Sequence, residues 1–503
     1  MPTSVRETER KYEAPAEGGL PALSGFPGVA AEAGPEDQVL EAVYYDTEDL
    51  RLARAGLTLR RRTGGDDAGW HLKLPAGKDT RQELRLPPGR ATRRPPEDLS
   101  SLVQVHTRGV DLAPVARIKT ARRRWQLVDE RGQLLAEVVE DHVSAQTLGA
   151  ETTAESWREI EVELGERGNG KLLTAVESRF REAGIRRATS SAKLTRLLAN
   201  RIEPRTPAPS PGKRSTAGDA VLAYLHEQAD ALKHHDPRVR RDEHDAVHQM
   251  RVATRRMRSA LQAYGKIVDR SGTRELTDEL KWLAGVLGNA RDLEVLRTRF
   301  ETAAGELPPE LRLGPVTARL TRYFAPLEAS AHEESVAALN DPRYFALLDR
   351  IDALLADPPL TPLALKPARK VVPKLVKRAY KRLARRAETA LRTDAGHESD
   401  VALHESRKSA KRLRYATEVA VPVLGKPAKK YHEKAKAVQT LLGEHQDSVV
   451  ARPVLRELGV QAHLDGENGF TFGLLHGREA CIADQIEQRF PSSWRQVGKP
   501  KLH

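Results

Sequence analysis

The sequence predicts an α+β protein of two unlike domains, an antiparallel β domain followed by an all-α domain. Two observations carry this prediction. Short segments in which polar and apolar residues alternate fill residues 5–165, whereas long amphipathic helical patterns follow from about residue 218. Between them, residues 202–217 are rich in Pro, Ser and Gly, a composition typical of linkers. We therefore expect domains over 1–201 and 218–503, joined by this linker.

In the N-terminal domain, polar and apolar residues alternate with a period of two in short segments bounded by Gly, Pro and Asp, which predicts strands. Alternation over such short runs is typical of antiparallel strands, in a sheet or in a barrel. A helical pattern over 172–184 follows the last of these strands. The clearest strand segments are 57–62, 70–74, 123–129, 134–141 and 157–164.

The helical domain contains an internal repeat. The segment that begins with HQMR at His248 returns as HESR at His404, 156 positions later. The segment LGNARD of the first copy returns as LGEHQD, 155 positions later. Chance rarely preserves two motifs together with their spacing, so we infer a duplicated helical unit with halves of about 218–350 and 370–500.

Charge and composition indicate an anionic partner. The 503 residues carry a formal net charge of +13 and a pI near 9.7, while only 5% are aromatic. Phosphate suits such a surface. Single-stranded nucleic acid is disfavoured because it needs aromatic platforms for base stacking. A basic surface that merely keeps the protein soluble is the alternative.

The sequence gives no indication of a disulfide, a thiolate metal site or a membrane span. Cys481 is the single cysteine, and no uninterrupted apolar run reaches the length of a membrane span. The first residues are charged from Arg6 onward and contain no apolar signal segment. We therefore expect a cytoplasmic protein.

Charged side chains of both signs alternate along the predicted strands. Residues two apart share a face, because successive side chains of a strand point to opposite faces. Glu7, Glu9 and Lys11 share a face in this way, and one such pattern alone would be an ordinary solvated edge. The spacing recurs in Arg60 and Arg62, Arg122 and Arg124, and Glu159 and Glu161; Glu137 and Asp141 share a face, and Lys73 stands between apolar neighbours.

A charged face that points into a barrel must be neutralised by bound ions or by mutual pairing. Carboxylates without His or Cys neighbours favour hard divalent cations such as Mg²⁺ or Mn²⁺. Arg and Lys suit the oxygens of a linear phosphate chain. The combination predicts a phosphate tunnel with a metal at one side.

Several motifs of the N-terminal domain occur in a fixed order. They are the ExExK opening, the stretch from YYDT to LRRR (44–62), WHLKLP (70–75) and WREIEVEL (157–164). In these motifs, over about residues 3–200, the domain resembles the CYTH superfamily, the triphosphate tunnel metalloenzymes. The resemblance implies an eight-stranded antiparallel tunnel barrel with flanking helices that acts on triphosphates with a divalent metal.

Carried over residue by residue, the resemblance implies roles for the charged residues. The catalytic residues would be Glu7, Glu9 and Lys11. The metal ligands would be Glu7, Glu9, Asp141, Glu159 and Glu161, with Glu137 as the alternative to Asp141. The phosphate-binding residues would be Arg60, Arg62, Lys73, Arg122, Arg124 and Lys193. Lys193 lies in a weak motif, SSAKLTRLL, and a solvated helix lysine is its alternative.

Four nearby positions stay open. Lys119 is out of phase with Arg122, which is the preferred phosphate contact of this strand. Glu83 and Arg85 fit either a salt bridge of the barrel or a phosphate contact. Glu163 extends the acidic alternation and is expected to be a neighbour of the site.

The repeated helices carry a cationic face in each copy. Residues spaced three, four and three apart lie on one helical face, and like charges at this spacing repel one another. The two tetrads are His248, Arg251, Arg255 and Arg258, and His404, Arg407, Lys411 and Arg414. Cationic neighbours disfavour metal binding by the histidines, whose alternative is a core or capping hydrogen bond. A duplicated, self-repelling face favours a polyanionic ligand.

The helical part resembles the CHAD domain over about 215–500. The resemblance rests on HQMRVATRRMRSAL, LGNARDLEVL, LHESRKSAKRLRYATE and LLGEHQDSVV. It implies two helical bundles related by pseudo-twofold symmetry and a basic groove that holds inorganic polyphosphate. Asp292 and Asp447 would orient arginines of the groove or touch the ligand.

The two resemblances together lead us to expect an inorganic triphosphatase with a polyphosphate-binding domain. ATP and thiamine triphosphate are alternative substrates, and adenylate cyclases share the barrel family, although no base-recognition motif is evident. A non-catalytic protein that binds polyphosphate, or directs the chain to polyphosphate granules, is the alternative from another class. Nucleic-acid binding through the basic helices is a third.

Overall fold

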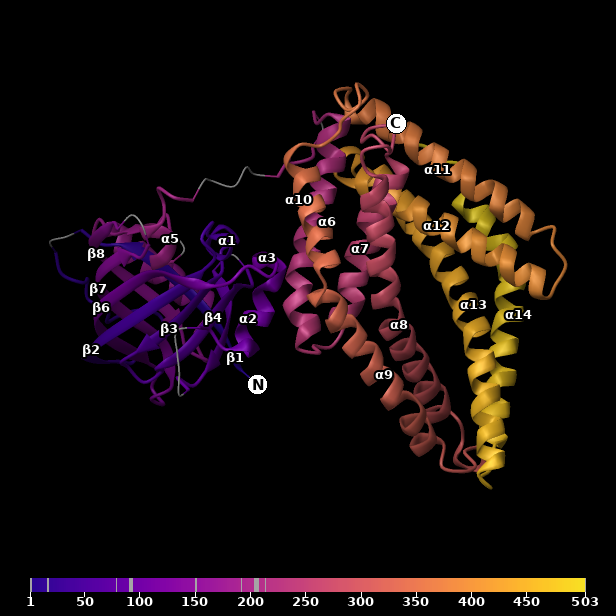
Figure 1. Ribbon diagram of the computed structural model, residues 1–503, viewed down its shortest axis with the longest axis horizontal. Helices are drawn as coiled ribbons and strands as arrows, with labels where there is room; N and C mark the ends of the chain where they lie inside the picture. The colour runs from indigo at the N-terminus through magenta and orange to yellow at the C-terminus, as the bar shows by residue number, and fades with distance from the viewer. Residues whose placement is uncertain are drawn as a thin grey trace. The chain divides into compact units, whose positions relative to one another are not determined.

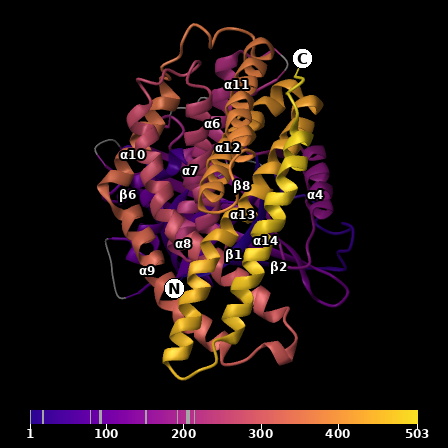
Figure 2. The same cartoon turned by 90° about the vertical axis from the view of Figure 1, so that its right-hand side faces the viewer.

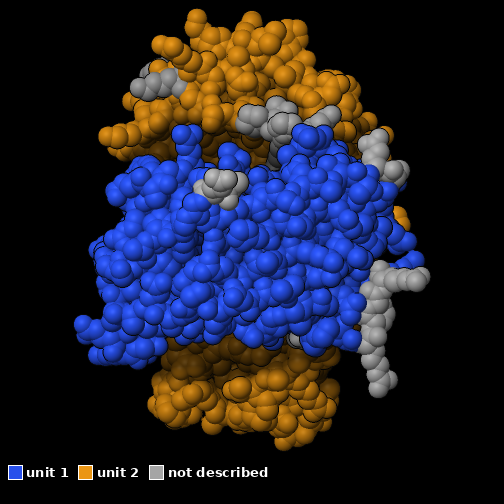
Figure 3. All heavy atoms as spheres, turned by 90° about the vertical axis from the view of Figure 1, so that its left-hand side faces the viewer, with its two compact units in different colours: residues 1–206 blue, residues 207–503 orange. Residues whose placement is uncertain are grey.

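The computed structural model describes residues 2–15, 18–77, 79–89, 94–149, 152–190, 192–202, 208–212 and 214–502. The chain divides into two compact units, Met1–Thr206 and Pro207–His503 (Figure 3). Of the expected linker over 202–217, residues 203–207 and 213 lie outside the described residues. Each unit is therefore described by itself.

The first unit is a closed antiparallel barrel (Figure 1). Its sheet order is β5-β4-β3-β2-β6-β7-β8-β1, and pairing of β5 with β1 closes it, while β9 adds a short edge to β1. The strands are β1 (Thr3–Glu13), β2 (Ala31–Asp46), β3 (Thr58–Thr63), β4 (Gly69–Pro75), β5 (Thr80–Leu86), β6 (Ala113–Val128), β7 (Leu134–Thr147), β8 (Ala154–Leu164) and β9 (Arg186–Arg187). The expected eight-stranded antiparallel barrel is confirmed.

Period-two alternation sorts the barrel side chains into an apolar outer set and a charged inner set. On β4, Trp70 is buried in an apolar cluster, whereas its neighbour His71 faces the charged interior. On β1, Tyr12 packs against Phe180 of helix α4 with ring centroids 5.0 Å apart. The flanking helices are α1 (Arg51–Arg54), α2 (Glu97–Ser100), α3 (Gln104–Thr107), α4 (Gly170–Glu182) and α5 (Lys193–Leu197). Their apolar faces cover the outer set and leave the inner set around a cavity.

Strand β2 continues through a Gly-Pro step, which disturbs its pairing with β6 without ending the strand. The register between β2 and β6 shifts between Ala33 and Glu36. Gly34 has φ of +111°, and a Cβ atom there would lie 2.5 Å from the carbonyl oxygen of Arg124. Only glycine fits this close approach of two strands.

The second unit consists of long helices (Figures 1 and 2). Helices α6–α9 and α11–α14 form the two copies of the repeat, with α10 between them. Their bounds are α6 (Ala217–Arg240), α7 (Ala246–Ala263), α8 (Arg274–Gly305), α9 (Val316–Asn340), α10 (Pro342–Ala356), α11 (Ala368–Ala390), α12 (His397–Leu424), α13 (Lys426–Leu464) and α14 (Phe470–Val497). The expected all-helical fold is confirmed. None of the described helices is both long and apolar enough to cross a membrane.

The two copies meet through equivalent positions. The backbone N–H of Ala217 donates to the carbonyl oxygen of Lys366 at 2.8 Å, and the N–H of Ala368 donates to that of Ser215 at 3.0 Å. An offset of 151 positions makes Ala217 equivalent to Ala368 and Ser215 equivalent to Lys366. Helices α7 and α12, which carry the cationic tetrads, also pack against each other.

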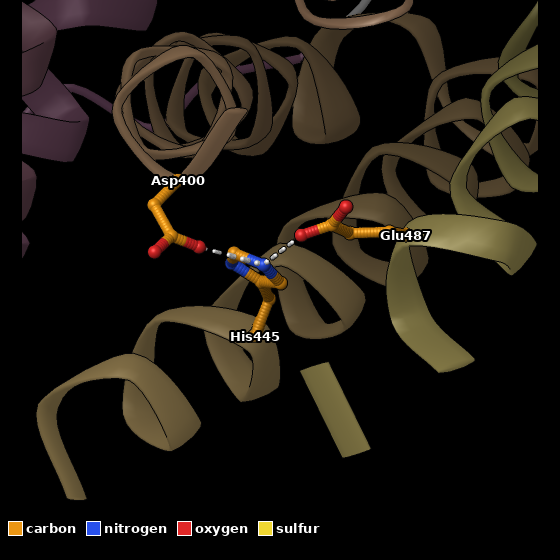
Figure 4. Close-up of side chains that lie close together, drawn as sticks. All are labelled: Asp400, His445 and Glu487. Atoms are coloured by element: carbon orange, nitrogen blue, oxygen red, sulfur yellow. Dashed lines mark hydrogen bonds and ion pairs between the residues drawn. The ribbon is translucent and has the colours of Figure 1, made fainter. Parts of the chain in front are cut away.

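A buried histidine connects three helices of the second copy. The Nε2 atom of His445, on α13, lies 3.4 Å from Asp400 Oδ1 on α12 and 3.2 Å from Glu487 Oε1 on α14 (Figure 4). Arg452 lies 3.3 Å from the other oxygen of Asp400. A protonated imidazole ring would satisfy both carboxylates only in part, because Nε2 carries a single hydrogen.

Candidate functional site: a charged tunnel and a cationic groove

The inner face of the barrel lines a cavity of about 660 Å³. Carboxylates and cations both face it, as the strand pattern predicts. Its acidic strand residues include Glu7, Glu9, Glu83, Glu137, Glu161 and Glu163, and its basic residues include Lys11, Arg60, Arg62, Lys73, Arg81, Arg85, Arg122, Arg124 and Lys193. Tyr44 is the one aromatic residue among its described lining residues.

Three carboxylates gather behind one wall of this cavity. Asp141, Glu159 and Glu161, here called the carboxylate triad, offer oxygens that lie within 4.8 Å of one another. The Nζ atom of Lys193 lies 2.8 Å from Asp141, 2.8 Å from Glu159 and 2.7 Å from Glu161. Burial lowers the pKa of Lys193, but the three carboxylates outweigh burial and raise it well above its ordinary value. Lys193 is therefore a charged, buried partner of the triad rather than a solvated helix lysine.

Two further cations reach the triad. Arg122 binds Asp141 with two hydrogen bonds of 2.8 Å and 2.7 Å, and lies 3.5 Å from Glu161. Lys11 forms an ion pair with Glu161. Burial raises the pKa of Glu161, but Lys11, Lys193 and Arg122 outweigh it and hold the pKa well below the ordinary value. Asp141, whose pKa is also lowered by Lys193 and Arg122, and Glu161 are thus held ionised, and the triad is heavily compensated by cations.

A second charged cluster occupies the β1, β4 and β5 side. Glu7 accepts hydrogen bonds from Lys73 at 2.6 Å and from Arg85 at 2.7 Å. Glu83 lies 3.6 Å from Lys73 and 3.8 Å from Arg60, and also pairs with Arg85. Burial raises the pKa of Glu7, and Lys73 only partly offsets the effect. The open question about Glu83 and Arg85 is resolved in part, because both belong to a salt-bridge network that lines the tunnel.

His71 belongs to this cluster, although the sequence-based assignment omits it. Its Nδ1 atom lies 3.0 Å from Glu83 Oε1, and its Nε2 atom lies 2.8 Å from the carbonyl oxygen of Asp67. Burial lowers the pKa of His71 to about 4, whereas the hydrogen bond to Glu83 opposes this effect. The signal was present in the sequence, because His71 stands two positions before Lys73 on the same strand face.

Glu9 and Glu163 lie directly opposite each other on β1 and β8. Like charges at such a position destabilise a strand pair. Glu9 also lies 3.5 Å from Lys11 and 3.6 Å from Arg81, whereas Glu163 forms no ion pair with any described residue. Burial, followed by the charge of Glu7, raises the pKa of Glu163 to about 7. Glu163, expected only as a neighbour, is thus the least compensated carboxylate of the tunnel.

The remaining cations stand on β3 and β6. Arg60 donates to the hydroxyl of Tyr44 at 3.3 Å, and Arg62 pairs with Asp67. Burial, followed by the charges of Arg60 and Arg122, lowers the pKa of Arg62 to about 9, which indicates an excess of positive charge at this end. An anion would relieve this repulsion.

Arg124 also lines the cavity, but acidic partners surround it. It binds Glu36 at 2.5 Å and Asp66 at 3.2 Å, and lies 3.9 Å from Glu137. Glu137 is therefore a neighbour of Arg124 rather than a member of the triad, where Asp141 stands. Lys119 is exposed on the outer face, as its phase predicts.

The donor set of the triad fits a hard divalent cation. All its donor atoms are carboxylate oxygens, and their mutual separations allow one ion to contact all of them. The ammonium of Lys193 contacts the same three residues, so a divalent cation and Lys193 would compete for them. Glu7 and Glu9 stand on the neighbouring strand β1, and Glu7 binds a different set of cations from the triad.

The helical unit gathers a second cationic site. Arg251 and Arg255 on α7 lie close enough to Arg407 and Lys411 on α12 to influence their ionisation. We call these four residues the central cluster. Burial, followed by the charges of Arg255 and Arg407, lowers the pKa of Lys411 to about 6. The structure therefore unites the middle positions of both tetrads in one self-repelling group.

An aspartate holds each outer arginine of the central cluster. Arg251 Nη1 lies 2.9 Å from Asp292 Oδ1, and Arg407 Nη2 lies 3.5 Å from Asp447 Oδ1. A Cβ atom at Gly288 would lie 3.3 Å from Arg251 Nη2, so the Leu-Gly motif leaves room for the guanidinium. These contacts support the arginine-orienting role expected for the two aspartates.

The end positions of the tetrads have other surroundings. His404 contacts Gln446, and burial followed by the charge of Arg291 lowers the pKa of His248. Arg414 donates to Gln439 at 2.6 Å and lies 3.3 Å from Glu418. Arg258 lies near Asp278 and Arg412. The structure does not bring Arg258 and Arg414 into the central cluster, and their ligand-binding role stays a prediction.

Comparisons with known proteins agree with both domains. A family model of the CYTH domain matches residues 5–197, and one of the CHAD domain matches residues 223–456. An uncharacterized protein of Mycobacterium tuberculosis strain CDC 1551 (Oshkosh) is 37% identical over 513 residues, which cover 99% of this chain and 97% of the relative. An uncharacterized protein of strain H37Rv shows the same identity and coverage.

Two solved structures are similar to the chain. PptA from Streptomyces chartreusis is 21% identical, with a TM-score of 0.45, and the match covers 56% of this chain and 100% of that one. The CHAD domain from the plant Ricinus communis is 23% identical, with a TM-score of 0.48, and the match covers 60% of this chain and 99% of that one. From the family matches and the full-length relatives, the chain belongs to the family of proteins that join a CYTH domain, with its triphosphate tunnel fold, to a CHAD domain.

Proposed function

We propose that the barrel hydrolyses the terminal phosphate of a triphosphate, with inorganic tripolyphosphate as the preferred substrate. The observation that carries the proposal is the two-signed tunnel. Carboxylates of β1, β7 and β8 face cations of β3, β4 and β6 across one cavity. A linear triphosphate needs cations for its oxygens and carboxylates for the metal that accompanies it.

Different residues of the tunnel would bind the phosphate oxygens and the metal. Lys11, Arg60, Arg62, Lys73 and Arg122 would hold the phosphate oxygens. The carboxylate triad, with Glu7 and Glu9, would hold Mg²⁺ or Mn²⁺. The metal would neutralise the substrate and stabilise the negative charge that develops when the P–O–P bond breaks. The oxygen of water bonds to the terminal phosphorus as the bridging P–O bond breaks. Orthophosphate and pyrophosphate are the products, and the proton of water passes to solvent.

The lining favours an inorganic chain over a nucleotide. Tyr44 is the only aromatic residue among the described lining residues, and its ring is buried in an apolar cluster. A purine or thiamine ring would therefore find no free aromatic face for stacking within the described cavity. ATP and thiamine triphosphate remain the alternative substrates.

The direct test measures phosphate release from tripolyphosphate, ATP and thiamine triphosphate, each with Mg²⁺ and with Mn²⁺. We expect the highest kcat/KM for tripolyphosphate and no turnover in EDTA. Faster turnover of ATP or thiamine triphosphate would contradict the substrate assignment. No turnover of any triphosphate with either metal would contradict the proposal of an enzyme.

We further propose that the helical domain binds long-chain inorganic polyphosphate through the central cluster. Four cations that disfavour one another's charge gain most from a polyanion that bridges them. A non-catalytic role in polyphosphate binding, or in association with polyphosphate granules, is the second candidate function, and this cluster favours it. Binding without any triphosphatase activity would distinguish that candidate from the first.

A further inference from the structure

The duplication gives the helical domain two pockets at equivalent places. The first pocket has a volume of about 760 Å³ and lies between the end of α7, the start of α8, α11 and Arg412 of α12. The second, of about 540 Å³, lies between the end of α12, the start of α13, α6 and Arg256 of α7. The offset of 156 positions between the two copies makes Arg256 equivalent to Arg412 and Gln262 equivalent to Glu418. The charges that line the two pockets can therefore be compared position by position.

In the second pocket, one carboxylate neutralises the cations. Glu418 lies 3.1 Å from Arg256 Nε and 3.3 Å from Arg414 Nε. It also accepts a hydrogen bond of 2.7 Å from the hydroxyl of Tyr224. Glu227 and Glu433 add further negative charge to the lining. The second pocket is thus a self-compensated polar contact between the two copies.

The first pocket lacks that carboxylate, because Gln262 stands where the second has Glu418. Asp278 is the single acidic residue of its described lining. Among the described residues, none forms an ion pair with any of its lining cations. These cations are Lys266, Arg270, Arg274, Arg378, Arg382, Arg385 and Arg412. Arg412 is half-buried and the other six cations are exposed. Water therefore screens their mutual repulsion, but no ion pair with a described carboxylate offsets it.

One of these cations is held in place by neutral groups. The Nη2 atom of Arg270 donates to the carbonyl oxygen of Gln262 at 2.8 Å. Its side chain lies against Gly265, where a Cβ atom would come within 2.5 Å of Arg270 Cγ. The arginine is therefore positioned without being neutralised, and its charge stays available for a ligand.

We propose that the first pocket is an anion-binding site for a short phosphate chain, separate from the central cluster, and that its pseudo-symmetric counterpart is not. The four cations of the central cluster are not among the described lining residues of this pocket. Guanidinium groups from three helices suit the non-bridging oxygens of consecutive phosphates, which accept bidentate hydrogen bonds. The site stands on its own geometry, so it does not depend on polyphosphate binding by the central cluster.

The test exchanges the residue that distinguishes the two pockets. The full chain is incubated with tripolyphosphate and EDTA, and hydrogen–deuterium exchange is followed by mass spectrometry. In the unmodified chain we expect protection of residues 266–274 and 375–385 and none of 220–228. Gln262→Glu should raise the Kd of the first pocket at least tenfold and abolish this protection, whereas Gln262→Leu should leave it intact.

Two further measurements separate the first pocket from the central cluster and from general phosphate binding. Arg407→Glu with Lys411→Glu reverses two of the four charges of the central cluster and should leave protection of the first pocket unchanged. Orthophosphate at the same phosphate concentration should protect the pocket less than tripolyphosphate, since it engages fewer of the cations. The proposal fails if the first pocket shows no protection, if Gln262→Glu retains it, or if Gln262→Leu loses it as Gln262→Glu does.

Discussion

The Nζ atom of Lys193 lies 2.7 Å from Oε1 of Glu161, so a fixed ammonium shares the oxygens that a metal would use. Lys193→Met leaves three buried carboxylates with less compensation. We expect the metal-free barrel to lose about 3 kcal/mol or more of stability, which corresponds to a fall in Tm of roughly 6–12 °C. Mn²⁺ should raise the Tm of this variant more than that of the unmodified chain, because the metal takes the vacated place. Equal shifts in both would contradict a metal at the triad.

The exposed Lys171 on α4 provides the matched control. Lys171→Met should change neither the Tm nor its response to Mn²⁺. Differential scanning fluorimetry with and without EDTA measures all three proteins.

Glu9→Gln tests the catalytic assignment on β1. The substitution keeps the size of the side chain and removes a charge that lies opposite Glu163. We expect kcat for tripolyphosphate to fall by about 100-fold or more. The Tm should change little, because the loss of the ion pairs with Lys11 and Arg81 opposes the relief of repulsion with Glu163. Glu32→Gln, at an exposed position of β2, should retain full activity. Full activity of Glu9→Gln, or activity that persists in EDTA, would remove the metal-tunnel mechanism.

The lowered pKa of Lys411 predicts that polyphosphate binding depends on pH. Lys411 faces Arg251 and Arg255 of α7, Arg407 of its own helix and Asp447 of α13. Its pKa is about 6 without ligand, against an ordinary value of 10.5. The negative charge of bound phosphate raises the pKa of Lys411. Above pH 6, where the free amine is mostly neutral, binding is therefore accompanied by uptake of a proton by Lys411. The affinity should therefore be flat below pH 6 and fall above it, by at most about tenfold per pH unit.

Isothermal titration calorimetry in buffers of different ionisation enthalpy measures this proton uptake. Lys411→Arg keeps the charge at all pH values and should bind without uptake. Proton uptake that persists in Lys411→Arg would place the titrating group elsewhere.

Charge reversal tests the central cluster directly. Arg251→Glu with Arg255→Glu, or Arg407→Glu with Lys411→Glu, should each weaken long-chain polyphosphate binding strongly, and all four together should eliminate it. The affinity of the unmodified chain should also fall steeply with added salt, as for other phosphate polymers. Reversal of the exposed Arg456 and Arg489 is the control and should have little effect. If duplex DNA displaces polyphosphate at equal phosphate concentration, the cluster is only a general basic surface.

The buried histidine of Figure 4 predicts a stability effect in the second copy. His445→Gln removes the ring that lies within 3.4 Å of Asp400 and 3.2 Å of Glu487. We expect a loss of about 1–3 kcal/mol from the unpaired polar groups, read as a lower midpoint of urea unfolding. His463→Gln, exposed on the same helix, should be neutral. An unchanged midpoint in His445→Gln would mean that these contacts contribute nothing to the packing of the three helices.

Strand periodicity allowed most of the tunnel to be predicted, because alternation alone decides which side chains face inward. It placed Glu7, Glu9, Lys11 and Arg60 in the lining without any knowledge of strand pairing. It did not reveal which charges meet, since the contact of Lys193 with the triad joins segments that lie far apart in the chain. Alternation did not predict the full length of β2, because this strand continues through a Gly-Pro step as an irregularity.

In the helical domain, too, the sequence predicted which residues share a helical face but not which residues they contact. The spacing of a tetrad puts Arg255 and Arg258 on one side of α7, but it cannot tell which neighbouring helix each residue meets. Packing sends Arg255 toward Arg407 and leaves Arg258 near Asp278. The repeat itself was visible in the sequence. The difference between Gln262 and Glu418 acquires meaning only when both pockets are compared in the structure.

The reciprocal backbone bonds of Ala217 with Lys366 and of Ala368 with Ser215 have an evolutionary consequence. Reciprocal bonding of this kind, in which position i of one copy bonds position j of the other and j of the first bonds i of the second, is the isologous contact of a twofold homodimer. A half-length ancestor could have made the same bonds between two separate chains. Fusion of two such genes would make assembly independent of protein concentration, and it would free each half to mutate alone.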